Sequence, residues 1–347
     1  MKDKKKMIIN FLIYVLLFGA TYYVIFRKQD MSVLISNFKN TNVIYILIAF
    51  GMMILFYLLE ALNVRNLLRS FGEKTSLKRT FNSTLIGAFY SAITPASSGG
   101  QPMQVYYMSK LYDTKVSKST LALLRHLFGH QFSIVIIGIT CAIFNQMIFD
   151  SNLVYLFLIG TFFNFVVLSF YFICIFSESL TNKLVNLAKK IVKVFKPRKC
   201  EKINKKIDSE LELFHESSEY IKNHQREFMS ALLIAVLQVL VNYSIPFFVY
   251  KAFGFSGYSI FYFISIQAIL FCTVSCIPLP GSVGISETVF LVLYSHIYTD
   301  SMLHNALLIH RGISFYLFVL INLVVVLINN IIISKRDSKK WISFLFV

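Results

Sequence analysis

The stretch Thr94-Pro95-Ala96-Ser97-Ser98-Gly99-Gly100-Gln101-Pro102 interrupts apolar sequence with residues that cannot continue a helix. Apolar residues precede it (Leu85–Ile93), and an aromatic run follows it (Met103–Tyr107). Its prolines, adjacent glycines and hydroxyls leave backbone groups unpaired, which a bilayer tolerates only where the backbone lines a protein-walled or watery cavity. The stretch therefore predicts a broken helix at a membrane-embedded site. An ordinary loop between two helices is the alternative.

A second interruption near the other end of the chain resembles the first. It is Ile277-Pro278-Leu279-Pro280-Gly281-Ser282-Val283-Gly284-Ile285-Ser286-Glu287, again between apolar runs. An arginine follows each break inside apolar sequence, and Gln101 to Arg125 spans 24 positions, as does Glu287 to Arg311. Paired, Pro- or Gly-broken apolar segments in corresponding halves indicate the substrate site of a transporter.

Composition places the whole chain in the membrane. Of 347 residues, 56% are hydrophobic and mean hydropathy is +0.65, so we predict a polytopic membrane protein. The first apolar run, Met7–Phe26, is followed by Arg27-Lys28-Gln29-Asp30 and not by a small-residue cleavage site, which favours a retained helix over a signal peptide. The net charge of +17 lies between apolar segments, so it indicates topology and contact with anionic lipid headgroups, and no nucleic-acid partner is expected.

The predicted fold is all-α, with about eight membrane-embedded helices plus two re-entrant broken hairpins. A first membrane half covers residues 1–176, a basic cytoplasmic hairpin 177–227, and a second membrane half 228–347. The apolar runs predict spans at about Ile8–Phe26, Val43–Leu62, Ser119–Ile148, Leu153–Phe176, Phe228–Tyr250, Ser259–Cys276 and Leu303–Ser334. Lysines and arginines at both ends of the chain place the N- and C-termini in the cytoplasm by the positive-inside rule.

The helices beside the breaks are too short for a full crossing. Thr80–Ile93 rises roughly 1.5 Å per residue against a hydrocarbon core of about 30 Å. If the chain turns at 94–102 and returns through Met103–Leu111, the first hairpin is entered from the cytoplasm. The second, with its break at 277–287, is then entered from outside, and the halves are inverted repeats whose broken tips meet near the midplane. Full spans at both breaks are the alternative and keep the same termini.

The predicted cytoplasmic segment is strongly basic. Residues Lys183–Lys206 contain ten Lys or Arg and one acid, with apolar residues at helical spacing. This pattern is typical of an amphipathic helix at a membrane surface. A solvated linker helix is the alternative. The more acidic Asp208–Glu227 is expected to fold back as a second helix.

Ionisable side chains inside apolar runs are the first candidates for function, because each costs about 2.5–3.5 kcal/mol to insert. Arg125 and Arg311 carry planar guanidiniums that hold a phosphate in a bidentate fork, so they lead as contacts for a lipid phosphate. In the alternative interpretation each neutralises a buried carboxylate, Glu60 or Glu287.

The breaks themselves supply further candidate contacts to a headgroup. Glu287 is expected to pair with an arginine when the site is empty and with a cationic headgroup when it is loaded. Its counterpart by spacing, Gln101, is neutral, so the two half-sites are chemically unequal. Backbone N–H groups at the helix starts could hold an anion, although a tight turn explains the same glycines. These candidates are Ser97, Ser98, Gly99, Gly100, Gly281 and Gly284.

The remaining buried ionisable groups suggest a proton or charge relay. Its candidate members are Glu60, His126, His130 and His310. The four-residue spacing of His126 and His130 is formally a metal spacing, but no zincin pattern accompanies it, so we expect no metal, and ordinary core histidines are the alternative. We also expect no cofactor, because no nucleophile elbow, phosphate-binding glycine loop or paired-carboxylate motif stands in a convincing context.

The two breaks together, with Tyr106-Tyr107 after the first, resemble the lysylphosphatidylglycerol synthase transmembrane (flippase-like) family over almost the whole chain. The best-known relatives are the multiple peptide resistance factors of bacteria, in which such a membrane region flips lysylphosphatidylglycerol and a separate soluble domain makes it. Because the chain ends at Val347, the resemblance implies the translocating half alone. Relatives often carry Glu where this chain has Gln101, which puts a cationic headgroup at the first half-site in doubt.

The resemblance implies a lipid flippase of the bacterial plasma membrane whose partners are anionic or aminoacylated phospholipids. The sequence leaves alternatives open. One is a phosphatidylglycerol lysyltransferase, for which the basic segment Lys183–Lys206 is the one conceivable place for tRNA. Another is a membrane partner of a separately encoded lipid synthase. A homodimer also remains open, as do the lipid, its direction of movement and any coupled ion.

Overall fold

The chain folds as a bundle of helices. The computed structural model describes residues 41–144, 153–195, 225–275 and 277–345, together with isolated positions between 204 and 211. These residues form helices and short connections, with no strand among them, and five of the helices are long and apolar enough to cross a membrane. The prediction of an all-α polytopic membrane protein is confirmed. The predicted first span, Ile8–Phe26, lies outside the described residues.

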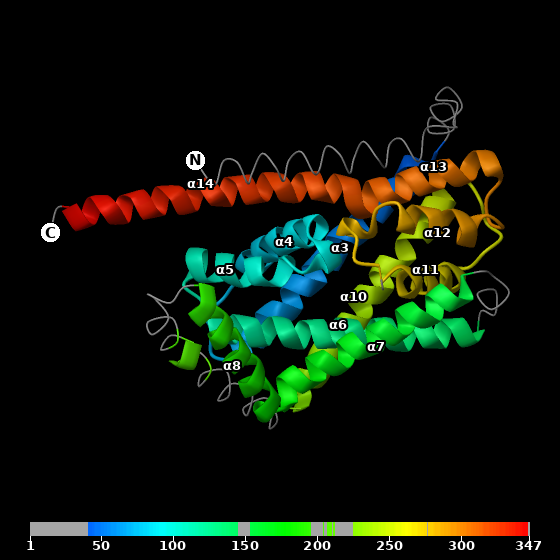
Figure 1. Cartoon of the computed structure of the whole chain (residues 1–347). Coiled ribbons are helices and arrows are strands. Elements are labelled where there is room, and N and C mark those ends of the chain that lie inside the picture. Colours follow the sequence, from blue (N-terminus) through cyan, green and yellow to red (C-terminus); the bar gives the residue numbers. More distant parts are fainter. Residues whose placement is uncertain are drawn as a thin grey trace.

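The elements follow one another in an order that repeats a pattern of long helix, broken hairpin and long helix (Figure 1). They are α3 (Val43–Ser70), α4 (Leu77–Ile93), η1 (Pro95–Ser97), α5 (Gly100–Tyr112), α6 (Val116–Phe144), α7 (Val154–Phe176), α8 (Glu178–Phe195), α10 (Gln225–Ala252), α11 (Ile260–Val274), η4 (Pro280–Ser282), α12 (Ile285–Tyr294), α13 (Asp300–Arg311), η5 (Gly312–Tyr316) and α14 (Leu317–Leu345).

Helices α3 and α10 pack antiparallel and set the two ends of the bundle. The backbone N–H of Asn42, before α3, donates to the carbonyl of Ala252, at the end of α10 (2.8 Å). Near the other end of the pair the Asn63 amide donates to the Ala231 carbonyl (2.9 Å). The end of α3 therefore lies at the start of α10. Side chains of both helices join α11, α12 and α13 in the largest hydrophobic core.

The first break turns the chain back on itself. Asn82, early in α4, donates to the hydroxyl of Tyr112, the last residue of α5 (2.8 Å). At the other end of the pair, a Cβ built on Gly100 would lie 1.9 Å from Ser91 Oγ and 2.8 Å from the Gly87 carbonyl oxygen. Glycine is therefore required at position 100 for α4 and α5 to approach closely near the break. Together α4, η1 and α5 form a hairpin with its base at residues 77 and 112.

The second break forms the corresponding hairpin from α11, η4 and α12. Tyr294, the last residue of α12, donates from its hydroxyl to Gln267 of α11 (2.9 Å). At the base, Tyr262 hydrogen-bonds to His296 through its hydroxyl (2.6 Å). The start of α11 thus lies beside the end of α12, as an antiparallel hairpin requires.

The two hairpins enter the bundle from opposite ends, and their tips touch. The first begins just after the end of α3, and the second just after the end of α10, at the opposite end of that antiparallel pair. The turns η1 and η4 contact one another in the middle (Figure 1). Helices α3 and α6 flank the first hairpin, and α10 and α13–α14 flank the second. Helix α3 runs opposite to α10, and α6 runs opposite to α13–α14. The described halves are therefore inverted copies of one arrangement.

The last predicted span, Leu303–Ser334, is an interrupted helix. Helix α13 ends at Arg311, a π-helical turn follows over Gly312–Tyr316, and α14 continues past the first hairpin. The amides of Asn329 and Asn82 exchange two hydrogen bonds of 3.0 Å, which join α14 to α4. The C-terminal helix is thereby fastened to the base region of the N-terminal hairpin.

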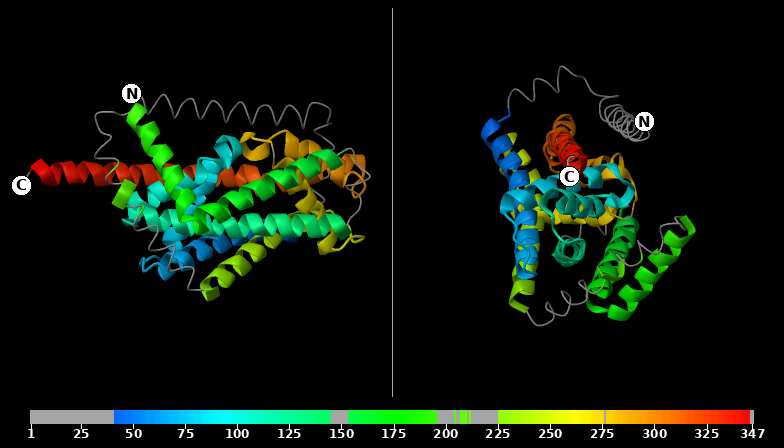
Figure 2. Two further views of the ribbon diagram at one scale, coloured as in Figure 1. Left: turned by 60° about the horizontal axis from the view of Figure 1, so that its bottom comes forward. Right: turned by 90° about the vertical axis from the view of Figure 1, so that its left-hand side faces the viewer.

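Helix α8 occupies the basic segment and lies at the periphery, beside α7 and away from the broken hairpins (Figure 2). It confirms a helix at the start of this segment. Most of the predicted second helix, Asp208–Glu227, lies outside the described residues. Contact of α8 with a membrane surface stays a prediction.

Candidate functional site between the two helix breaks

The two breaks begin with the same three-residue backbone turn. Each is a 3₁₀ turn that begins with proline, at Pro95 and at Pro280. The next two residues have positive φ in both turns, at 50° and 54° in Ala96-Ser97 and at 58° and 50° in Gly281-Ser282. A left-handed conformation costs a residue other than glycine roughly 1–2 kcal/mol, and such strain persists where the surrounding structure enforces it.

This shared turn fixes the register between the halves. Helices α5 and α12 begin at Gly100 and Ile285, each five residues after its proline. Gln101 therefore corresponds to Ser286, and the counterpart of Glu287 is Pro102. The equal spacings of 24 residues do not mark structurally equivalent positions. The structure corrects that pairing by one residue: Gln101 lies 24 residues before Arg125, whereas its counterpart Ser286 lies 25 residues before Arg311, so the extra residue of the second half lies after the turn.

A cavity of about 370 Å³ lies where the two tips meet. Residues of both breaks line it, as do side chains from α3, α4, α5, α6, α10, α11, α13 and η5. Its wall combines charged and amide groups with aromatic rings. The polar lining residues are Glu60, Ser91, Ser97, Gln101, Gln104, His126, His130, Asn242, Gln267, Ser282, Ser286, His310, Arg311, Ser314 and Asn322.

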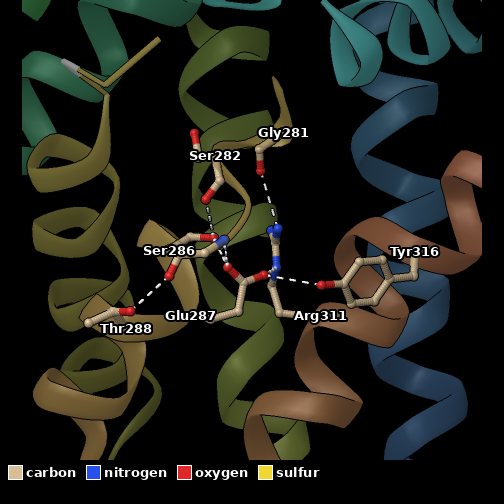
Figure 3. Close-up of polar contacts among 8 residues, drawn as sticks. Gly281, Ser282, Ser286, Glu287, Thr288, Arg311 and Tyr316 are labelled. Atoms are coloured by element: carbon tan, nitrogen blue, oxygen red, sulfur yellow. Dashed lines mark hydrogen bonds and ion pairs between the residues drawn. The ribbon is translucent and has the colours of Figure 1, made fainter. Parts of the chain in front are cut away.

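Glu287 and Arg311 form a buried ion pair at the wall of this cavity (Figure 3). Arg311 Nε donates to Glu287 Oε1 at 2.7 Å, and the Glu287 side chain is 1% exposed. The other carboxylate oxygen accepts from the backbone N–H of Gly284 (2.6 Å) and from the Ser286 hydroxyl (3.1 Å). Tyr316 also donates to Oε1 (3.2 Å). Glu287 sits in the first turn of α12, where the helix dipole favours a negative charge.

Arg311 keeps one edge free toward the cavity. Its Nη2 donates to the carbonyl of Gly281 (3.2 Å), and its guanidinium lies 4.5 Å from the ring centre of Phe315. Among the described residues no acceptor contacts Nη1, although Arg311 lines the cavity. The guanidinium is thus oriented by a carboxylate, a carbonyl and a ring, with donors left over for a ligand.

Glu60 provides a carboxylate at the wall formed by the first half. Its polar neighbours are Thr84 of α4, Gln104 of α5 and Gln238 of α10. His126 Nε2 lies 4.0 Å from Glu60 Oε2. Glu60 therefore connects α3 to both arms of the first hairpin and to two neighbouring long helices.

The three candidate histidines all line the cavity but have different surroundings. The Asn63 amide donates to His126 Nδ1 (3.3 Å), so that Nε2 of this ring carries the proton facing Glu60. His130 lies one turn further along α6, 6.1 Å from His126 between ring centres. His310 stacks on Phe290 (5.4 Å, 18° between planes). Within the described residues no three His, Cys, Asp or Glu side chains gather as a metal site would require.

Arg125 does not reach the cavity, which corrects the predicted grip of one phosphate by Arg125 and Arg311. Arg125 is 3% exposed and lies over the ring of Phe228, 5.2 Å from its centre, between α6 and α10. Within the described part of the chain, its Nε and Nη2 have no hydrogen-bond partner. It does not pair with Glu60, whose contacts are given above. The reason is rotational: Arg125 and His126 are neighbours on one helix and must face different directions.

The backbone amides of Ser97, Ser98 and Gly99 are used within the first turn, which corrects the predicted role of these three as anion donors. The N–H of Ser97 donates to Thr94 O (3.1 Å), that of Ser98 to Pro95 O (3.2 Å) and that of Gly99 to Thr94 Oγ1 (2.8 Å). In the second break the N–H of Gly284 is taken by Glu287, and Gly281 contributes its carbonyl to Arg311. The tight-turn interpretation describes these residues better.

Sequence reasoning missed the neutral polar lining. Amides within apolar helices form much of the wall, among them Gln104 beside Glu60 and Gln267 facing Tyr294. The signal was present, since an amide in hydrocarbon is costly unless it finds a partner. A ranking that considers only charged residues omits these amides.

The fold and site define a class: polytopic membrane proteins in which two inverted broken hairpins enclose a polar cavity in the interior. The sequence profile described as "Lysylphosphatidylglycerol synthase TM region" matches residues 7–321, and the chain belongs to this family. The chain is also similar to a protein named "UPF0104 membrane protein" from Archaeoglobus fulgidus. The two are 26% identical over 301 residues, which cover 82% of this chain and 86% of that protein.

Proposed function

We propose that this protein moves a phospholipid between the leaflets of a membrane by receiving its headgroup in the cavity between the hairpin tips. The observation that carries the proposal is Arg311, a guanidinium on the cavity wall oriented by Glu287 and retaining free donors. A headgroup phosphate that leaves water loses its hydration, so a path through the bilayer needs such a preformed partner.

The polar character of the cavity favours a headgroup with both signs of charge. Arg311 lines one part of the wall, and Glu60 lines another. A phosphate would accept hydrogen bonds from Arg311 Nη1, while an amine on the same headgroup would be attracted to Glu60. Lysylphosphatidylglycerol, the lipid in the family's name, has these features. The acyl chains would remain outside the polar cavity.

The inverted hairpins support alternating access as the mechanism. Each hairpin reaches the cavity from one end of the bundle, so rearranging one relative to the other would open the cavity toward either side. Basic residues after α3 and at the end of α14 favour the cytoplasm for the base of the first hairpin and for the C-terminus. With this orientation, the cell membrane of a bacterium is the proposed location. Energy would come from the lipid gradient or from an ion, with Glu60 and the cavity histidines as the groups that could carry a proton.

Reconstitution tests the proposal. Liposomes would contain fluorescent phosphatidylglycerol or its lysyl form, and the lipid accessible to dithionite would be followed over time without nucleotide. We expect leaflet exchange faster than in protein-free liposomes, and its loss in Arg311→Ala. Wild-type exchange in Arg311→Ala would remove the assigned site. No exchange with any anionic or aminoacylated lipid would remove the function.

Two other functions make different predictions. A lysyltransferase would bind lysyl-tRNA, which filter binding measures directly. A membrane partner of a separate lipid synthase would co-purify with that enzyme. Neither has a specific structural observation behind it comparable to the Arg311 site.

A further inference from the structure

A second hollow adjoins the central cavity on the side of the first hairpin. It has a volume of about 380 Å³ and lies between α5 and α6. Its walls are mainly apolar, and three of its residues, Gln101, Leu123 and Leu127, also line the central cavity. The other lining residues are Pro102, Val105, Thr120 and Leu124. We name this hollow the α5–α6 groove.

The groove extends from the cavity toward the base of the first hairpin. On α6 its residues run from Leu127, which lines the cavity, back to Thr120, close to the start of the helix. Seven residues of helix correspond to roughly 10 Å. The Thr120 hydroxyl donates to the carbonyl of Val116 (2.8 Å), so it presents no unsatisfied polar group to the groove. The groove is therefore a short apolar channel whose polar end, at Gln101, adjoins the central cavity.

The second hairpin is filled at the corresponding positions. In the register fixed by the two turns, the counterparts of Pro102 and Val105 are Glu287 and Phe290. Glu287 is held in its ion pair, and Phe290 is 1% exposed and stacked on His310. The two halves therefore share a backbone turn but differ beside it. One half is sealed by polar and aromatic contacts, and the other is hollow and apolar.

We propose that the α5–α6 groove binds an acyl chain of the lipid whose headgroup occupies the central cavity, and that Gln101 marks the junction between them. This inference rests on the proposed function. Shared lining residues make the polar and apolar spaces continuous, as a molecule with a charged head and an apolar tail requires. Because the groove runs toward the base of the first hairpin, the lipid enters from the leaflet on that side.

Photolabelling tests occupancy without altering the groove. The probe is phosphatidylglycerol with a diazirine in one acyl chain, reconstituted with the full chain and irradiated, and adducts are located by mass spectrometry. We expect adducts on Val105 and Leu124 that fall at least fivefold in Arg311→Met, because the tail loses its anchored head. Adducts on the exposed α7 residue Leu158 should not change. Groove adducts that persist in Arg311→Met at the wild-type level would overturn the proposal, since they would report bulk lipid only.

Substitution then tests passage. Val105→Trp and Leu124→Trp fill the groove, and Leu158→Trp adds the same bulk to the lipid-exposed face of α7 as the matched control. We expect leaflet exchange to fall at least tenfold in the groove variants and to stay within twofold in the control, with all three proteins equally monodisperse. Wild-type exchange in both groove variants would overturn the groove while leaving the flippase proposal intact. Absence of exchange in the wild type would instead refute the proposed function, and the photolabelling result would still decide the groove.

Discussion

Replacing both members of the Glu287–Arg311 pair separates its structural role from its role in transport. Glu287→Gln removes the charge and keeps the shape, but its single amide oxygen can replace only one carboxylate oxygen, the one that accepts from Gly284 or the one that accepts from Tyr316. Arg311→Met removes the guanidinium but leaves a carboxylate with three hydrogen bonds, from Gly284, Ser286 and Tyr316. Breaking a buried ion pair by removing one partner costs about 3–5 kcal/mol. We expect Glu287→Gln toward the upper part of this range, because Arg311 is left without a counter-charge, and Arg311→Met toward the lower part.

The double variant should recover most of the lost stability. Removing both charges leaves no uncompensated ion, and replacing a buried pair by uncharged groups is often near neutral. We expect the free energy of unfolding to return to within about 1–2 kcal/mol of the wild type. With single losses of about 4–5 and about 3–4 kcal/mol, this gives a coupling energy of about 5–8 kcal/mol. Denaturation in mixed detergent micelles, followed by circular dichroism, measures all four proteins. The exposed pair between Arg336 and Asp113 is the control, and Asp113→Asn should cost less than about 1 kcal/mol.

Transport measured on the same proteins decides the function of the pair. If Arg311 binds the headgroup, the double variant regains stability but exchanges lipid no faster than Arg311→Met. If the pair only holds α12 and α13 together, stability and exchange recover together. That second outcome would refute the assignment of Arg311 as a ligand group, and a coupling energy near zero would refute the ion pair itself.

The other predictions concern groups outside that pair. Arg125→Met should leave the rate of leaflet exchange within about twofold of the wild type. It should raise the free energy of unfolding by about 1–3 kcal/mol, because it removes buried N–H groups that lack partners. Loss of exchange in a stable Arg125→Met protein would show that Arg125 contacts the lipid after all. Gly100→Ala should destabilise the protein by about 1–3 kcal/mol through overpacking of the first hairpin. Gly51→Ala is the control and should be neutral or stabilising, because a Cβ at Gly51 has nothing within 4 Å. Equal unfolding midpoints of the two variants would contradict the close approach of α4 and α5. Partial burial lowers the pKa of His296, so the stability it contributes with Tyr262 is present at pH 7 and is lost as pH falls below the ordinary histidine pKa of about 6.5. Amide hydrogen exchange in this connection, corrected for the intrinsic rate, should rise toward pH 5 in the wild type and not in His296→Gln.

Local chemistry made the two breaks and their pairing predictable. Pro95 and Pro280 interrupt apolar runs where an unbroken helix would not tolerate proline, and the apolar segments beside them are too short for full crossings, which implies hairpins. The contact between the tips then follows from the inverted order of the elements. The Glu287–Arg311 pair was also foreseen, because both residues are too costly to bury alone.

Helix rotation and register were not predictable in the same way. A rotation of about 100° separates neighbouring residues on a helix, so the sequence could not tell whether Arg125 or His126 faces the cavity. Only packing against α10, through Phe228, decides it. The one-residue error in matching Gln101 to Glu287 has a different cause: the second half has one more residue between its turn and Arg311, and counting back from each arginine hides it.

The difference between the halves is as informative as their similarity. The same three-residue turn begins both breaks, and Ala96, Ser97 and Ser282 keep its left-handed conformation although it strains residues other than glycine. The side chains beside the turns then diverge: an ion pair and a stacked ring close the second half, while Gln101 and an apolar groove leave the first open. An inverted repeat with two equal half-sites would offer a headgroup two equivalent positions. Here one half holds an ion pair and the other leaves an apolar groove. In the proposed mechanism, the symmetry of the backbone would supply the framework for movement, and the asymmetry of the side chains would give a lipid one orientation within it.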